Sequence, residues 1–314
     1  MSEHVEPPIC VLGLGLIGGS LLRAAVAAGR TAWGYNRSAD PVRDAVADGF
    51  DATSDLRSAL VRAHESRALI VVAVPMPAVD AVLAAVAEHA PECPLTDVVS
   101  VKAPVAAAVA RAGLTERYVG GHPMAGTAES GWGASFADLF NGAVWVVAAD
   151  DGADPAVWSA VTRLALACGS VVIPAESNEH DRAVARISHL PHVLAEALAT
   201  SGAAGGDLAL GLAAGSFRDG TRVAATAPDL VRAMCEANAD ALLDALDETL
   251  AVLAAARETL AAGSLADLVG AGFAARQRYE NAQRWDITGI VPGDIGWLEA
   301  FRDAGRRGGA LRAL

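Results

Sequence analysis

The feature that most constrains the fold is a glycine-rich turn between a short apolar run and a helical stretch near the start of the chain. The apolar run covers residues 9–12, and the turn reads Gly13-Leu14-Gly15-Leu16-Ile17-Gly18. An alanine-rich helical stretch follows to about residue 29, and a second apolar run covers residues 31–35. A strand, a G-x-G-x-x-G turn and a helix in this order predict a turn that binds a dinucleotide.

Each glycine of this turn has its own expected role. Gly13 permits the tight turn, Gly15 lets a pyrophosphate approach the backbone, and Gly18 lets helix and strand pack closely. The helix begins near Leu16 and Ile17, and its N-terminal N–H groups are expected to face the phosphates. A turn that serves packing alone remains the alternative.

The residues after the second apolar run are expected to read the adenosine ribose. They are Asn36-Arg37-Ser38, where an enzyme that uses NAD usually has an acidic residue. The guanidinium of Arg37 and the hydroxyl of Ser38 could both bind a 2′-phosphate, which favours NADP over NAD. The alternative is that Arg37 stacks on the adenine and that NAD is used.

Apolar strands continue to alternate with helical stretches through the first half of the chain. Residues 69–74 form one apolar run and residues 97–102 form another, and both are typical of buried parallel strands. The sequence therefore predicts an α/β fold, a Rossmann-type doubly wound domain over residues 1–176. Ligands bind at the carboxyl ends of such strands, which places Val74, Pro75, Ser100 and Lys102 toward the cofactor. Ser100 could equally cap the next helix.

A second small-residue loop, residues 120–127, contains His122 as its only titratable side chain. The neighbouring glycines and Pro123 restrict the backbone, so the imidazole is presented at a fixed position. Histidine is also the side chain best suited to accept and release a proton near neutral pH. His122 is therefore the candidate catalytic group, and an exposed histidine in a glycine-rich turn is the alternative.

The pattern becomes helical after residue 176, which predicts an all-α domain over residues 177–314. In its first helix, His189 and His192 are three residues apart and could face one ligand, while Pro191 would kink the helix. Further on, residues 215–222 place Arg218 and Arg222 in a glycine-flanked turn that could hold an anion. Helices this apolar need a partner, and a second copy of the domain would provide it.

Composition excludes several functional classes. The formal net charge of −13 disfavours binding to nucleic acid or to an anionic membrane. No apolar run is long enough to span a membrane, and the acidic start, residues 1–6, lacks the features of a secretory signal, so a cytoplasmic protein is expected. The four cysteines are scattered, which fits neither a metal site nor a disulfide framework.

Taken together, these motifs resemble the prephenate/arogenate dehydrogenases of tyrosine biosynthesis. The resemblance extends over residues 9–260 in the same order. Its motifs are the glycine turn, Asp97-Val98-Val99-Ser100-Val101-Lys102, Gly121-His122-Pro123-Met124-Ala125-Gly126, Ser188-His189-Leu190-Pro191-His192 and Phe217-Arg218-Asp219-Gly220-Thr221-Arg222. It implies a Rossmann domain followed by a helical dimerisation domain, and NAD(P)-dependent oxidative decarboxylation of prephenate to 4-hydroxyphenylpyruvate, of arogenate to tyrosine, or of both.

The resemblance also implies roles for individual residues. His122 would hydrogen-bond the ring hydroxyl of the substrate and Ser100 would orient His122. Arg222 and His192 would hold the substrate carboxylates, and His189 and Thr127 would complete the substrate-binding set.

Two departures leave the substrate open, because Ala128 stands where many members have glutamate and Val231 where many have tryptophan. A relative that acts on 4-amino-4-deoxyprephenate in an antibiotic pathway is one alternative. A β-hydroxyacid-type dehydrogenase is another, although it would place a catalytic lysine in the helical domain, and the chain has no lysine after Lys102. A nicotinamide-sensing dimer without turnover is the third.

Overall fold

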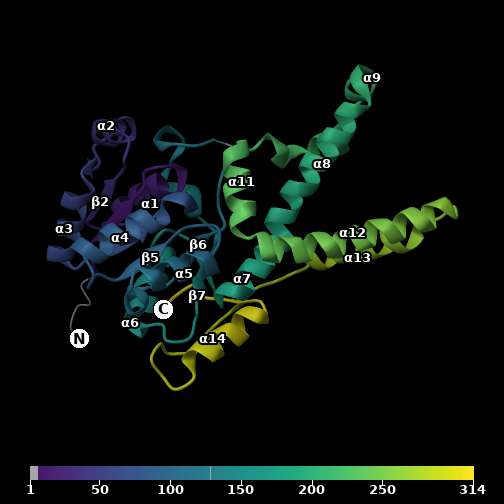
Figure 1. The fold of residues 1–314 in the computed structure, drawn as a ribbon. Helices are drawn as coiled ribbons and strands as arrows, with labels where there is room; N and C mark the ends of the chain where they lie inside the picture. Colours follow the sequence, from purple (N-terminus) through teal and green to yellow (C-terminus); the bar gives the residue numbers. More distant parts are fainter. Residues whose placement is uncertain (1–5, 128) are drawn as a thin grey trace. The chain divides into compact units, whose positions relative to one another are not determined.

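The computed structural model describes residues 6–127 and 129–314. The chain forms two compact units, shown with their elements in Figure 1. One consists of residues Met1–His180 together with Asp286–Leu314, and the other of residues Asp181–Trp285. Ala128 and most of the acidic start lie outside the described residues. No helix in the described part of the chain combines the length and apolar character needed to cross a membrane.

A five-stranded parallel sheet forms the centre of the first unit, with strand order β3-β2-β1-β4-β5. Its strands are β1 (Ile9–Leu12), β2 (Ala32–Tyr35), β3 (Ala52–Thr53), β4 (Leu69–Val72) and β5 (Leu95–Asp97). The order reverses between β1 and β4, so their carboxyl ends form the crevice in which doubly wound sheets bind ligands. The Rossmann-type fold predicted from the sequence is therefore confirmed.

Helices cover both faces of this sheet. They are α1 (Leu16–Ala27), α2 (Ala39–Ala47), α3 (Leu56–Ser66), α4 (Val79–His89), α5 (Ala103–Arg111) and α6 (Pro155–Ala167). Successive side chains of a strand point to opposite faces, and in β1 Ile9 and Val11 join one core while Cys10 and Leu12 join the other. The first core includes α1 and α6, and the second includes α3, α4 and α5.

A second sheet of three strands extends the first unit. It consists of β6 (Gly121–Pro123), β7 (Val144–Ala148) and β8 (Val171–Ala175) in the order β6-β7-β8. Strands β6 and β7 are antiparallel, and β7 and β8 are parallel. Short 3₁₀ turns lie between the main elements of the first unit, at Met76–Ala78, Thr115–Arg117, Trp132–Ala134 and Ala137–Phe140. His122, predicted to lie in a loop, is instead held in a strand.

The last 29 residues belong to the first unit and pack on its α6 and β8. They contain Asp286 of β9 (Trp285–Asp286), together with α14 (Trp297–Arg306) and β10 (Gly309–Ala310). Phe301 stacks on Trp158 of α6 with ring centroids 4.5 Å apart, and the backbone of Leu311 exchanges two hydrogen bonds with Val172 of β8. This differs from the expected helical domain over residues 177–314, because the apolar face of α14 finds its partners in α6 and β8.

The helical unit contains α8 (Leu190–Ala204), α9 (Gly206–Gly211), α10 (Gly215–Gly220), α11 (Pro228–Ala237), α12 (Ala239–Ala261) and α13 (Ala266–Glu280), with a 3₁₀ turn at Arg222–Ala225. Helix α7 (Ser177–Val184) leads into it through a π turn, Ala185–His189. Pro191 has no backbone N–H and cannot continue the α-helical hydrogen-bond pattern. The wider π turn lies just before this proline, where the sequence predicted a kink.

The helical unit leaves many large apolar side chains in solvent. Figure 1 shows α8 and α12 diverging along their length, so neither covers the other's outer half. Along α12, exposed leucine and valine side chains are Leu243, Leu250, Val252, Leu253 and Leu260. Exposed apolar side chains that recur along one helix are typical of an interaction site.

Candidate active site

The glycine turn adopts the conformation that its sequence predicts. Gly13 has φ 116°, and a Cβ on it would lie 2.5 Å from the carbonyl oxygen of Ala73 after β4. A Cβ on Gly18 would collide with the backbone of Gly13 and lie 2.9 Å from the Cβ of Ala73. A Cβ on Gly15, by contrast, would meet no atom within 4 Å. Gly13 and Gly18 are thus required by packing, whereas Gly15 borders open space at the N-terminus of α1.

Of the three residues after β2, Asn36 forms hydrogen bonds with the backbone, whereas Arg37 and Ser38 are exposed. The side chain of Asn36 accepts a hydrogen bond from the backbone N–H of Leu14 at 3.1 Å and donates one to the carbonyl oxygen of Ser38 at 3.2 Å. Arg37 and Ser38 are exposed, and Arg37 makes no ion pair within the described residues. Asn36 therefore supports the glycine turn, while the guanidinium of Arg37 is available to an anion.

Val74 and Pro75 follow β4 and lie at the same edge of the sheet as this turn. The Cγ1 atom of Val74 would be 3.2 Å from a Cβ on Gly13. Pro75 precedes a 3₁₀ turn, which carries the chain away from the sheet into α4. The turn after β1 and the segment after β4 are thus brought together at the topological switch point, as the sequence predicted.

His122 pairs with Val146 of β7, and its ring contacts a second histidine. Nδ1 of His122 lies 2.8 Å from Nε2 of His180, and the two rings are nearly perpendicular, at 78°. His180 belongs to the first turn of α7 and is only 3% exposed. No role was predicted for His180 from the sequence, because nothing local connects two histidines 58 positions apart.

A buried polar cluster contacts β6, the strand that carries His122. The ammonium group of Lys102 forms an ion pair with Asp97 and donates a hydrogen bond to the carbonyl oxygen of Gly121 at 2.6 Å. The hydroxyl of Tyr118 donates to the other oxygen of Asp97 at 2.6 Å. Lys102 and Asp97 are both 0% exposed. The lysine therefore braces the strand that carries His122.

This cluster corrects two predictions about residues 97–102. We expected one strand over the whole run, but β5 ends at Asp97, whose carboxylate accepts a hydrogen bond from the backbone N–H of Val99 at 2.8 Å and so turns the chain. We also expected Lys102 to face the cofactor, and it is instead buried against Asp97.

Ser100 and Thr127 flank His122 in sequence but make no contact that assigns them a role within the described residues. Ser100 is half-buried in the segment after β5, and the ring nitrogen Nδ1 of His122 is paired with Nε2 of His180. The hydroxyl of Thr127, which is exposed, accepts a hydrogen bond from the backbone N–H of Glu129 at 3.2 Å. The departure at Ala128 lies outside the described residues.

The helical unit brings His192 and Arg222 together but gives His189 other surroundings. Burial lowers the pKa of His192, the charge of nearby Arg222 lowers it further, and Glu196 and the backbone of Val223 act in the opposite sense. His189 is 0% exposed, and its Nδ1 lies 3.1 Å from the side-chain amide of Asn238. Residues 215–220 form the short helix α10 where a turn was expected, and Arg222 begins the 3₁₀ turn after it.

The cysteines take no part in these clusters. All four are free thiols, and Cys10, Cys93 and Cys168 are buried. Burial raises the pKa of Cys93 to about 11 and that of Cys168 to about 12, so both remain protonated near neutral pH.

A Rossmann sheet with this glycine turn, followed by a helical unit, defines an oxidoreductase that uses a nicotinamide dinucleotide. The family model for the nucleotide-binding domain of prephenate dehydrogenase matches residues 22–174, and the model for its dimerization domain matches residues 176–271. The chain belongs to the prephenate dehydrogenase family. The segment after residue 271, which includes α14, lies beyond both models.

Known proteins agree with this assignment. The crystal structure of a Corynebacterium glutamicum protein provisionally named a prephenate dehydrogenase superposes with a TM-score of 0.91 at 49% identity, and covers 97% of this chain and 98% of that one. The crystal structure of Synechocystis arogenate dehydrogenase superposes at 0.73 and 30% identity, over 87% and 99%. The cyclohexadienyl dehydrogenase of Zymomonas mobilis is 33% identical over 81% of this chain and 88% of its own length.

Proposed function

We propose that the protein oxidises and decarboxylates prephenate, arogenate or both, with His122 as the catalytic base. These substrates carry a carboxylate at C1 and a hydroxyl at C4 of a cyclohexadiene ring. The observation that supports the proposal is an imidazole held in β6, where the neighbouring Gly121 lies against Asp97 at the carboxyl end of β5 in the dinucleotide-binding sheet. The proposed substrate-binding residues are Arg222, His192, His189 and Thr127. The proposed role of Ser100 is to orient His122.

The chemistry requires a proton acceptor at the C4 hydroxyl. Neutral His122 accepts the hydroxyl proton while C4 releases a hydride. Loss of CO₂ from C1 then makes the ring aromatic and leaves an electron pair on the oxygen at C4, which takes the proton back from His122. The bound dinucleotide supplies the hydride acceptor. Arg222 is suited to a carboxylate because its guanidinium is planar, exposed and set in a chain with a net charge of −13.

NADP is the proposed cofactor, in preference to NAD. Open space at Gly15 fits a pyrophosphate next to the N-terminus of α1. The exposed guanidinium of Arg37 and the hydroxyl of Ser38, at the end of β2, fit the 2′-phosphate that distinguishes NADP.

A homodimer formed through the helical unit is the proposed assembly. The exposed apolar side chains of α12 would then be buried against a second copy, in keeping with the dimerization-domain match. All four cysteines are free thiols, as is usual in a reducing compartment, and we also propose that the protein acts in the cytoplasm.

The decisive experiment follows cofactor reduction with prephenate and with arogenate, each with NAD and with NADP, and includes 4-amino-4-deoxyprephenate as a third substrate. Turnover of prephenate or arogenate supports the proposal, whereas turnover of the amino analogue alone would replace it. His122→Asn should bind cofactor normally and lose roughly 10²- to 10⁴-fold in kcat, the usual contribution of a positioned base. A kcat near that of the wild type in this variant would exclude His122 as the base.

A further inference from the structure

We propose that His180 is a positioning residue that fixes the tautomer of His122, so that His122 can act as a base. This proposal rests on the proposed function, because it concerns the same imidazole. It is carried by the 2.8 Å separation between Nδ1 of His122 and Nε2 of His180. Two ring nitrogens at this distance share one hydrogen, which one ring donates and the other accepts.

The direction of this hydrogen bond decides what His122 can do. If Nδ1 of His122 carries the hydrogen and donates it to His180, then Nε2 of His122 keeps its lone pair and can accept the substrate proton. If His180 donates instead, Nε2 of His122 carries a hydrogen and can only donate to the substrate hydroxyl. Catalysis by a base requires the first arrangement, in which Nε2 of His180 is the acceptor.

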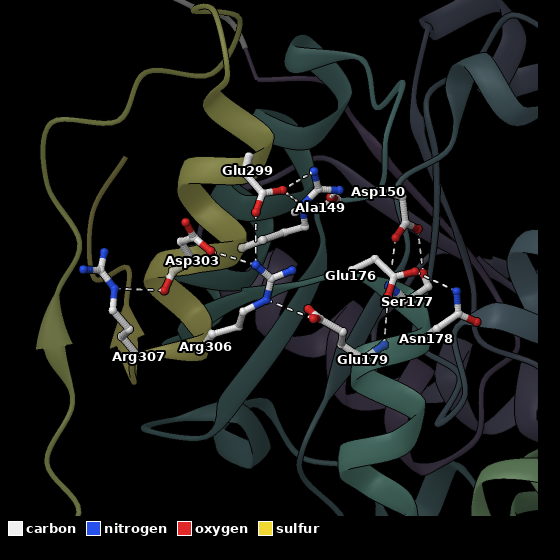
Figure 2. Close-up of polar contacts among 11 residues, drawn as sticks. Ala149, Asp150, Glu176, Ser177, Asn178, Glu179, Glu299, Asp303, Arg306 and Arg307 are labelled. Carbon is white, nitrogen blue, oxygen red and sulfur yellow. Dashed lines mark hydrogen bonds and ion pairs between the residues drawn. The ribbon is translucent and has the colours of Figure 1, made fainter.

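Local contacts hold His180 in place before any ligand binds. The backbone N–H and the hydroxyl of Ser177 both donate to the carboxylate of Asp150, at 2.8 and 2.6 Å. The backbone N–H of Glu179 donates to the carboxylate of Glu176 at 2.9 Å, and that of His180 to the carbonyl oxygen of the same residue. Figure 2 shows the contacts of Ser177 with Asp150 and of Glu179 with Glu176 at the start of α7.

The same turn is tied to the C-terminal helix. Arg306 of α14 forms an ion pair with Glu179 at 2.9 Å and also contacts Glu299 and Asp303 (Figure 2). Asp150, in turn, follows β7, the strand that pairs with His122. The two imidazoles are therefore connected through a short path of strand pairing and side-chain hydrogen bonds, which keeps their separation fixed.

Transfer of the substrate proton to His122 leaves the hydrogen bond between the two imidazoles in place. When Nε2 of His122 accepts the hydroxyl proton, the ring becomes an imidazolium whose Nδ1–H still donates to Nε2 of His180. His180 is nearly excluded from water, so the hydrogen bond to the charged ring is stronger than it would be in solvent. Lys102 donates a hydrogen bond to the backbone of Gly121, and the carboxylates of Asp150 and Glu179 form contacts at the start of α7.

The tautomer can be read directly by ¹⁵N NMR on the wild-type protein, without substrate. Long-range ¹H–¹⁵N correlations distinguish Nδ1–H from Nε2–H rings, and the chain has only seven histidines to assign. We expect the Nδ1–H form for His122 in the wild type, and a shift toward the Nε2–H form in His180→Phe. An Nε2–H ring at His122 in the wild type would overturn the proposal, whatever the substrate proves to be.

Kinetics provide the second test. His180→Phe should lower kcat by about tenfold or more, with KM for substrate and cofactor within about twofold of the wild type. His180→Gln should recover most of the rate, because its amide oxygen can accept the hydrogen from Nδ1 of His122. His64→Gln, on the exposed side of α3, is the matched control and should behave as the wild type.

The outcomes separate this proposal from the proposed function. An inactive His122→Asn together with a fully active His180→Phe would refute the positioning role and leave the proposed reaction in place. Wild-type protein without turnover on any of the three substrates would refute the reaction, while the NMR result would still decide the tautomer. If His180→Phe fails to fold, the wild-type spectrum and the Gln variant decide the question.

Discussion

Replacing Lys102 with methionine tests whether the buried ion pair beneath His122 is structurally essential. Methionine keeps an unbranched apolar side chain and removes the ammonium group. The carboxylate of Asp97 would then remain at 0% exposure with the hydroxyl of Tyr118 and the backbone N–H of Val99 as hydrogen-bond donors. Removing one partner of a buried ion pair costs about 3–5 kcal/mol, because the remaining charge is uncompensated.

Urea unfolding monitored by tryptophan fluorescence suits this test, because Trp285 is the only tryptophan outside the first unit. For a domain of this size, the expected loss corresponds to a fall in Tm of about 6 to 20 °C. Asp97→Asn combined with Lys102→Met removes both charges, so the double variant should be more stable than Lys102→Met alone. In a folded Lys102→Met protein, kcat should also fall, since the carbonyl of Gly121 loses its donor.

The reasoning fails if Lys102→Met unfolds at the urea concentration of the wild type. It also fails if the double variant is less stable than Lys102→Met, because the unpaired carboxylate of Asp97 would then not be the cause of the lost stability. Arg111→Met is the matched control, because the ion pair of Arg111 with Asp80 is exposed and should contribute less than about 1 kcal/mol.

Three further predictions concern side chains outside this cluster. Arg37→Ala should weaken binding of NADP by roughly 1.5–3 kcal/mol and that of NAD by less, as measured by fluorescence titration; equal losses would mean that Arg37 only stacks on the adenine. Arg222→Lys should raise KM for the substrate strongly despite the retained charge, whereas Arg218→Lys should not, and the reverse pattern would show that Arg218 is the anchor. A thiol reagent at pH 8 should label half-buried Cys235 before Cys168, because burial raises the pKa of Cys168 to about 12; equally rapid labelling would contradict its burial.

Local sequence signals predicted the parts of the fold that depend on neighbouring residues. The glycine turn was predicted with the right strand before it and the right helix after it, because Gly13 and Gly18 are required by backbone contacts within one strand–turn–helix unit. Buried parallel strands are short apolar runs, and the change to helical periodicity after residue 176 has the same local origin. The position of His122 between small residues is likewise a local signal, and it is sufficient to indicate the candidate base.

No local sequence signal predicted the contacts between residues that are far apart in the sequence. Gly121 lies 19 positions from Lys102, and His180 lies 58 positions from His122. A lysine is expected in solvent unless a buried acid pairs with it, and only the folded chain shows that Asp97 does so. The C-terminal helix α14 has an apolar face that could pack on either unit, and its stacking on Trp158 decided which. Periodicity shows that a face is apolar, but only the three-dimensional arrangement selects the surface that covers it.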